Sequence, residues 1–158
     1  MKRILRNIMF TLAISSVATL SYAATSVKNV SFEDQWDVSH AISEQTQWLI
    51  FSSHKDGGKW VKESLTELEV TDLEAYKIVY VADISAMPSF ITSMFAIPKM
   101  QDLAFKIYLD KEGDATVNWP RNQEQVSVYK VENGTFAGTQ YFAEKDALKA
   151  FLQTLIVQ

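Results

Sequence analysis

The residues best suited to chemistry lie in a short polar segment that follows an apolar run. His54 and Asp56 come directly after the run 47–53, and Asp83 ends a second apolar run further along the chain. A histidine beside a carboxylate is an acid–base arrangement, because the carboxylate fixes the imidazole tautomer and stabilises its charged form. If the two runs are neighbouring strands, His54 and Asp83 meet at the carboxyl edge of a sheet, where ligands collect. His54 and Asp83 are therefore the candidate catalytic residues.

Simpler interpretations of the same residues stay open. One histidine and one aspartate carry little specificity, so His54 is also explained as a solvated loop residue with an incidental acidic neighbour. Ser52 and Ser53 lie nearby, but no Gly-x-Ser-x-Gly elbow surrounds them, so the histidine lacks an obvious nucleophile. Asp56 is explained as the N-cap of the helix that follows. The other histidine, His40, has no companion in the sequence and is expected at a surface or turn.

The composition excludes several kinds of site. The chain has 158 residues and no cysteine, so thiol nucleophiles, dithiol redox chemistry, iron–sulfur clusters and cysteine-ligated zinc are excluded. Asp110, Glu112 and Asp114 alternate like calcium ligands, but Arg121 stands where the twelfth-position carboxylate is needed, and a polar turn is the better interpretation. The five glycines form no phosphate loop or dinucleotide fingerprint. We expect neither a metal nor a cofactor.

The segment 1–23 has the features of a secretory signal peptide. A basic start precedes an apolar run at 8–20, which is shorter than the roughly 20 residues of a membrane span. Ser21 and Ala23 fit the small-residue cleavage pocket, so we expect cleavage after Ala23, with an uncleaved anchor as the alternative. The expected location is a bacterial periplasm, with no stable membrane insertion after cleavage.

The charge balance bears on the partner. The chain has a formal net charge of −4, and all its acidic residues lie beyond residue 23, so removal of the leader makes it more acidic still. Such a surface is unsuited to sequence-independent nucleic-acid binding, which needs Lys and Arg to neutralise phosphates. We expect no nucleic-acid partner.

The candidate residues must be positioned by a single domain over 24–158, since no linker, repeat or like-charge block divides it. Strands are predicted at 47–53, 77–83, 105–109, 125–131 and 135–142. Helical periodicity occurs at 60–68, 85–98 and 144–155. Asn133-Gly134 between the last two strands predicts a hairpin turn. This order predicts a mixed α/β sheet covered by helices on both faces.

The middle helix carries an unusually wide apolar surface. Ser85 is its expected N-cap, and Pro98 is expected to end or kink it. Met87, Phe90 and Met94 belong to apolar positions that cover more than half of its circumference. One interpretation is a helix pressed against the sheet. The other is that one side remains exposed and offers a Met-rich docking surface.

The segment WLIFSSHKDGGKWVKESLTEL resembles the strand, active-site turn and first helix of thioredoxin-fold proteins. In that family an apolar strand leads into Trp-Cys-Gly-Pro-Cys and a helix bearing Lys and Glu. On this alignment Asp56 and Lys59 stand at the two cysteine positions, with Gly57 and Gly58 between them. The resemblance places these residues at a strand-to-helix junction over a central sheet.

Two further segments extend the resemblance to most of the chain. QVSVYKVENGTFAGTQYFAEKDALKAFL is similar to the last hairpin and final helix of that fold, and SFEDQWDVSHAI resembles the N-terminal hairpin of its exported branch. The chain looks like the small periplasmic thioredoxin-like proteins of the YtfJ type. The resemblance implies a three-layer α/β/α sandwich, with a mixed central sheet and an N-terminal β-hairpin extension.

The departures from the family pattern decide the expected function. Both cysteines are missing, and Glu124 or Gln125 stands where the family has a cis proline, so its oxidoreductase activity is not carried over. We expect a redox-inactive binding or accessory module for an envelope protein or peptide. The alternatives are a cysteine-independent enzyme that uses His54 with Asp56 or Asp83, and a small-molecule-binding envelope stress protein. The predicted binding residues are His54, Asp56, Gly57, Gly58, Lys59, Met87, Phe90, Met94, Glu124 and Gln125.

Overall fold

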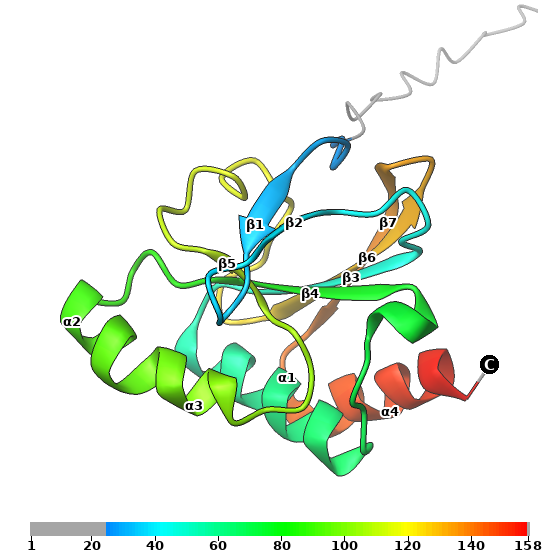
Figure 1. Ribbon diagram of the computed structural model, residues 1–158. Helices are drawn as coiled ribbons and strands as arrows, with labels where there is room; N and C mark the ends of the chain where they lie inside the picture. Colours follow the sequence, from blue (N-terminus) through cyan, green and yellow to red (C-terminus); the bar gives the residue numbers. More distant parts are fainter. Residues whose placement is uncertain (1–24, 158) are drawn as a thin grey trace, which may run out of the picture.

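A computed structural model describes residues 25–157 (Figure 1). The predicted signal peptide at 1–23 lies outside the described residues. Within 25–157, no helix combines the length and the apolar character needed to cross a bilayer.

The chain alternates between strands and helices, as the sequence pattern predicts. The strands are β1 (Ser31–Glu33), β2 (Ser39–Ala41), β3 (Trp48–Ser52), β4 (Ile78–Asp83), β5 (Tyr108–Asp110), β6 (Val126–Glu132) and β7 (Thr135–Phe142). The α-helices are α1 (Lys55–Glu67), α2 (Ser89–Ile91), α3 (Ile97–Gln101) and α4 (Lys145–Ile156). A 3-10 turn η1 (Glu74–Tyr76) precedes β4, and a π-helical turn η2 (Thr92–Ala96) joins α2 to α3.

The seven strands form one mixed sheet in the order β2-β1-β5-β4-β3-β6-β7. The central strands β3, β4 and β5 run parallel, while the β1–β2 and β6–β7 pairs are antiparallel. The N-terminal hairpin of β1 and β2 joins the sheet because β1 pairs with β5 in antiparallel orientation. The parallel centre matters for function, because it brings the carboxyl ends of β3 and β4 to one edge.

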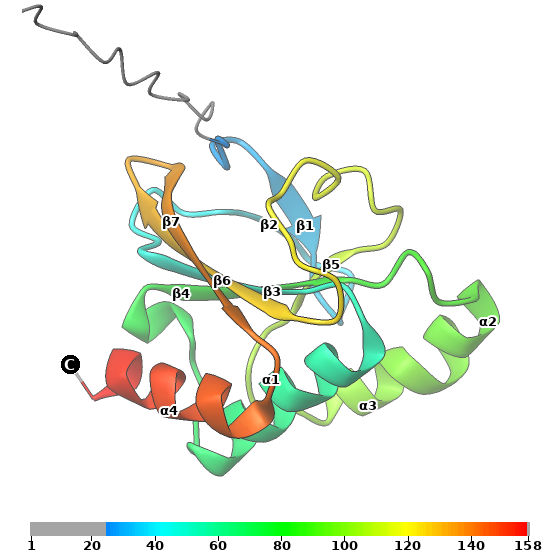
Figure 2. The ribbon, with the colours of Figure 1, turned by 180° about the vertical axis from the view of Figure 1, so that it is seen from behind.

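The two faces of the sheet are covered differently. On one face, Ile50 and Tyr80 pack with side chains from α1, α3 and α4. On the other face, Phe51 and Val81 pack with Trp119 and with the N-terminal segment around Val27, and no helix contributes to this cluster of described residues. Both ribbon views show the helices on the same side of the sheet (Figures 1 and 2). The mixed α/β class and the hairpin extension are as predicted, whereas the second covering layer is irregular chain instead of helix.

The middle helix begins later than predicted, and Ser85 is not its N-cap. The helix starts at Ser89, after Pro88. The backbone N–H and hydroxyl of Ser85 both donate to the carboxylate of Asp83, at 3.0 and 2.6 Å. A residue before proline avoids the α conformation, so Met87 prevents a helix from starting at Ser85.

Pro98 does not end the helix, which continues to Gln101. The π-helical turn η2 lies just before the proline, and the N–H of Ile97 donates to the carbonyl of Thr92, five residues earlier. Proline has no N–H for the carbonyl four residues before it, and a widened turn lets the chain pass this position.

Two turns were predicted correctly. Asn133 and Gly134 have φ values of 51° and 72°, the positive values that the β6–β7 turn requires. The buried carboxylate of Asp110 accepts bonds from the N–H of Gly113 at 2.9 Å and from the N–H of Thr116 at 2.9 Å. The acidic segment after β5 is therefore a polar turn, organised by its first carboxylate.

Candidate functional site

The candidate site lies where β3 gives way to α1. β3 ends at Ser52, α1 begins at Lys55, and the parallel neighbour β4 ends beside them at Asp83. Residues 54–60 thus occupy the predicted strand-to-helix junction at the edge of the central sheet (Figure 1). The free N–H groups at the start of α1 face this edge.

His54 is the N-terminal boundary residue of α1, with an extended φ of −145°. Its carbonyl accepts the N–H of Gly58 at 3.0 Å, and its ring stands edge-on to Trp60 at a centroid distance of 5.8 Å. Both ring nitrogens are buried and have no hydrogen-bond partner among the described residues. The expectation of a solvated histidine is therefore wrong for the ring nitrogens, since the half-buried imidazole packs against Trp60 and the start of α1.

Neither predicted carboxylate pairs with His54. Asp56 is exposed at the second residue of α1 and makes no capping hydrogen bond, so its predicted N-cap role is wrong. The carboxylate of Asp83 accepts Ser85 on one oxygen and the guanidinium of Arg121, at 3.2 Å, on the other. Asp83 therefore fastens the loop that carries Arg121, and it does not orient the imidazole.

Two hollows meet at His54. The first, which we call the polar hollow, has a volume of about 610 Å³. It is lined by His54, Lys55, Asp56, Trp60, Gln123, Glu124, Gln125 and Ala143. Glu124 adopts a left-handed φ of 57°, which turns the chain just before β6. The structure thus brings together four predicted binding residues from two distant segments: His54, Asp56, Glu124 and Gln125.

The second, which we call the apolar hollow, has a volume of about 390 Å³. Its apolar lining comes from Ala82, Ile84, Ala86, Met87, Ile91 and Met100. Its polar lining comes from Ser52, Ser53, His54, Lys55, Gly58, Lys62, Tyr80 and Asp83. Lys62, Tyr80 and Met100 were not predicted as site residues, since their burial depends on elements that are distant in the sequence.

A buried hydroxyl pair forms part of the wall of the apolar hollow. The Ser52 hydroxyl and the Tyr80 phenol lie 2.8 Å apart, and both residues are almost fully buried. Burial raises the pKa of Tyr80 to about 12, although the bond to Ser52 lowers it slightly. The phenol therefore stays protonated at neutral pH and serves as a fixed hydrogen-bonding group.

Replacing Tyr80 with phenylalanine is expected to destabilise the protein by about 1–3 kcal/mol, because the Ser52 hydroxyl stays buried without its partner. The Ser52→Ala/Tyr80→Phe double variant is expected to be no less stable than the Tyr80→Phe variant, since no orphaned hydroxyl remains. Urea unfolding of both single variants and the double variant measures this coupling. Strictly additive losses would contradict it.

Three other predicted binding residues, Lys59, Phe90 and Met94, lie on the exposed surface. Lys59 is exposed and pairs with Glu63 at 3.7 Å, outside both hollows. Phe90, Met94 and Phe95 are 60%, 67% and 54% exposed, and we call them the apolar patch. The helix that carries them also lines the apolar hollow through Ile91. Of the two interpretations of this wide helix, the exposed side is the one found.

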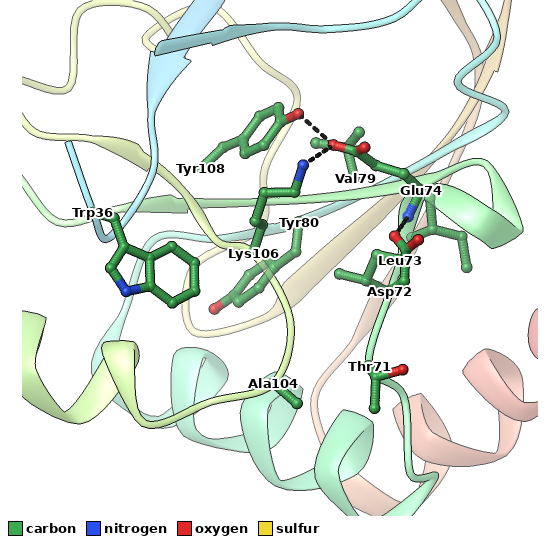
Figure 3. Close-up of a pocket in the computed structure, with 11 residues that line it drawn as sticks. Trp36, Thr71, Asp72, Leu73, Glu74, Val79, Tyr80, Ala104, Lys106 and Tyr108 are labelled. Carbon is green, nitrogen blue, oxygen red and sulfur yellow. Dashed lines mark hydrogen bonds and ion pairs between the residues drawn. The ribbon is translucent and has the colours of Figure 1, made fainter. Parts of the chain in front are cut away.

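A second polar cluster lies around β2 and β5, and it corrects the prediction for His40. The His40 Nε2 atom lies 2.7 Å from the Oδ2 atom of Asp34, and its ring stacks on Tyr108. The Tyr108 hydroxyl and the Lys106 ammonium both reach the Oε1 atom of Glu74, at 3.0 and 2.7 Å (Figure 3). His40 therefore has companions, which the fold assembles from the hairpin turn, η1 and β5.

The hydrogen bonds of this second cluster hold the N-terminal hairpin together, which gives the cluster a structural role. Burial raises the pKa of Asp34, but hydrogen bonds from His40 and from the N–H groups of Trp36 and Val38 outweigh it and lower the pKa below its ordinary value. The carboxylate holds the β1–β2 turn together. Within 25–157, no three His, Asp or Glu side chains are grouped as a metal site would require.

The comparisons with known proteins bear on the fold. No protein-family model matches the chain, and no curated protein sequence matches it either. Among solved structures, it is similar to one described as the thiol:disulfide interchange protein DsbE from Chlorobium tepidum, at 12% identity and a TM-score of 0.56. That match covers 85% of this chain and 94% of the other. The chain has a thioredoxin-like fold.

Two more structures support the same conclusion. The peroxidoxin BcpB from Mycobacterium tuberculosis matches at 10% identity and a TM-score of 0.54, over 85% of this chain and 96% of that one. StoA from Bacillus subtilis matches at 13% identity and a TM-score of 0.52, over 78% of this chain and 95% of that one. In this thioredoxin-like chain, Asp56 and Lys59 stand at the positions that the sequence resemblance assigns to cysteines. No peptide bond in the described residues is cis.

Proposed function

We propose that this chain is a redox-inactive, exported thioredoxin-like protein of the YtfJ type that binds a protein or peptide partner in the periplasm. The lack of cysteine supports the redox-inactive part, because thiol–disulfide exchange needs a thiolate. The leader-like sequence at 1–23 supports export.

The observation that carries the binding role is the apolar patch. Two aromatic rings and a methionine, each more than half exposed, lie within six residues of one helix. Contiguous exposed apolar surface of this kind marks interaction sites, and methionine adapts to partners of different shape. The patch adjoins the apolar hollow, because Ile91 of the same helix lines it. A partner that covers the patch would lie across the corner where the thioredoxin-like fold places its active-site turn.

The geometry gives less support to a cysteine-independent enzyme. Such an enzyme needs His54 within hydrogen-bond reach of a carboxylate and open to substrate. Among the described residues the imidazole has no such partner, and Asp83 already binds Ser85 and Arg121. The residues of the corner form surfaces and hollows, and they do not form a proton-transfer pair.

Site-specific photocrosslinking in the exporting cell tests the proposal. A photoreactive benzoylphenylalanine at Met94 is expected to give one or a few discrete adducts with an envelope protein or peptide. The matched control is Val117, which is 66% exposed but lies in the loop after β5, away from the patch. Adding Phe90→Glu to the Met94 probe is expected to reduce the adduct at least severalfold. Equal crosslinking at both positions, or none at Met94, would overturn the binding role.

A further inference from the structure

The apolar hollow combines an apolar interior with unpaired positive charge. Lys62 of α1 is half-buried, and no carboxylate of the described residues lies within ion-pair distance of it. Lys55, which also lines the hollow, is likewise without an ion pair among these residues. The one acidic residue in the lining, Asp83, is already paired with Arg121. The hollow is therefore locally cationic, in a chain whose net charge is −4.

Lys62 is under electrostatic strain in the free protein. Burial lowers the pKa of its ammonium group, and the positive charge of Lys99 on α3 lowers it further. A half-buried ammonium without a partner has lost part of its hydration and gained no hydrogen bond in exchange. A bound anion would supply both the missing partner and the missing countercharge.

The remaining lining defines what that anion must carry. Met87, Ile91 and Met100 present apolar groups to the hollow, while two of its lining hydroxyls, those of Ser52 and Tyr80, are already bonded to each other. The volume of about 390 Å³ falls within the range of small-molecule pockets. A ligand with one charged end and an unbranched apolar body matches this division of the lining.

We propose that the apolar hollow binds a small apolar monocarboxylate, such as a medium-chain fatty acid, whose carboxylate pairs with Lys62 and whose hydrocarbon body lies against Met87, Ile91 and Met100. This site goes beyond the proposed partner binding, which concerns the exposed apolar patch. The two are separable, because Lys62 lies on α1 and the patch lies on α2 and η2.

Calorimetry on the exported, purified protein tests the proposal with a chain-length series of hexanoate, octanoate, decanoate and dodecanoate. Affinity is expected to rise about three- to fourfold per added CH₂ group until the hollow is filled. Decanol and decylammonium, which share the apolar body, are expected to bind at least tenfold more weakly than decanoate. Decanol that binds as tightly as decanoate would overturn the charge pairing.

Variants locate the carboxylate. Lys62→Met is expected to lower decanoate affinity about tenfold and to leave decanol affinity unchanged, while Lys62→Arg retains most of it. The control is Lys77→Met, which removes the charge of an exposed lysine just before β4, outside the apolar hollow. An equal effect of Lys62→Met and Lys77→Met would indicate nonspecific attraction and would overturn the site.

Methionine methyl resonances locate the hydrocarbon body. Decanoate is expected to shift the methyl signals of Met87 and Met100 and to leave that of Met94 unchanged. Shifts confined to Met94 would place the ligand on the apolar patch and contradict the proposal.

The C-terminus of a peptide is another source of a carboxylate beside an apolar group. A short peptide with an apolar C-terminal residue, tested as free acid and as amide, distinguishes this source from a fatty acid. Binding of the free-acid peptide without any binding of decanoate would overturn a small-molecule site.

Discussion

Replacing Gln35 with alanine is expected to destabilise the fold by about 3–5 kcal/mol, a large share of the 5–15 kcal/mol typical of one domain. The side chain of Gln35 is fully buried in the turn between β1 and β2. Its amide nitrogen donates to the carbonyls of Phe105 at 2.9 Å and Met100 at 3.3 Å, and its oxygen accepts the N–H of Ile107 at 2.8 Å. Truncation leaves the carbonyl of Phe105 and the N–H of Ile107 without this partner, while the carbonyl of Met100 still accepts the N–H of Leu103 at 3.1 Å.

The measurement is urea unfolding, with two companion variants. Gln35→Leu keeps the volume but makes none of these bonds, and it is expected to lose nearly as much stability as Gln35→Ala. Gln153→Ala, on the exposed side of α4, is expected to change stability by less than about 0.5 kcal/mol. If Gln35→Leu is as stable as the unsubstituted protein, the side chain acts by filling space and the hydrogen bonds contribute little.

The same variant links stability to the candidate site. The side chain of Gln35 binds the backbone of Met100 in α3 and the backbone of Phe105 and Ile107 just before β5. Met100 also lines the apolar hollow. The carbonyl of Gln35 also accepts a bond from the side chain of Gln101 at 2.7 Å. The N-terminal hairpin therefore sets the position of α3, and through it the depth of the hollow.

Local sequence patterns were sufficient to predict the central strands, the last hairpin turn and the strand-to-helix junction. The apolar runs that became β3 and β4, and the Asn133-Gly134 turn, depend on residues adjacent in sequence and on steric rules that hold anywhere. The strand-to-helix junction at 54–60 was predictable for the same reason. Its N-cap was not, because Asp56 has the better capping side chain and yet the residue at the N-cap position is His54, two residues earlier.

Contacts between distant segments escaped prediction. Nothing around Gln35 signals burial, since its three partners lie more than sixty residues away. His40 meets Asp34 only because the intervening turn folds back on itself. Lys62 has the sequence context of an ordinary exposed helix residue, and it is half-buried because the segment after β4 closes the apolar hollow beside it. Residue type indicates such roles only once topology is known.

The adjacent glycines of α1 are expected to respond to alanine in opposite directions. At Gly58, an added Cβ would lie 3.6 Å from the Ser52 hydroxyl, which is ordinary contact, so Gly58→Ala is expected to stabilise by about 0.5–1 kcal/mol through helix propensity. At Gly57, an added Cβ would overlap the Cε1 atom of His54. Gly57→Ala must displace the imidazole and is expected to destabilise by about 1–3 kcal/mol.

A double-mutant cycle with His54→Ala isolates the cause. Once the imidazole is removed, Gly57→Ala no longer meets an obstacle and is expected to stabilise about as much as Gly58→Ala does. The coupling between the two sites is then about 2 kcal/mol, read from urea unfolding of the four proteins. In the Gly57→Ala single variant the displaced ring also alters both hollows, so decanoate affinity should change, while Gly58→Ala leaves the ring in place. A Gly57→Ala loss that persists without His54 would show that the helix start rejects a side chain for another reason, and that the glycine is not there to seat the histidine.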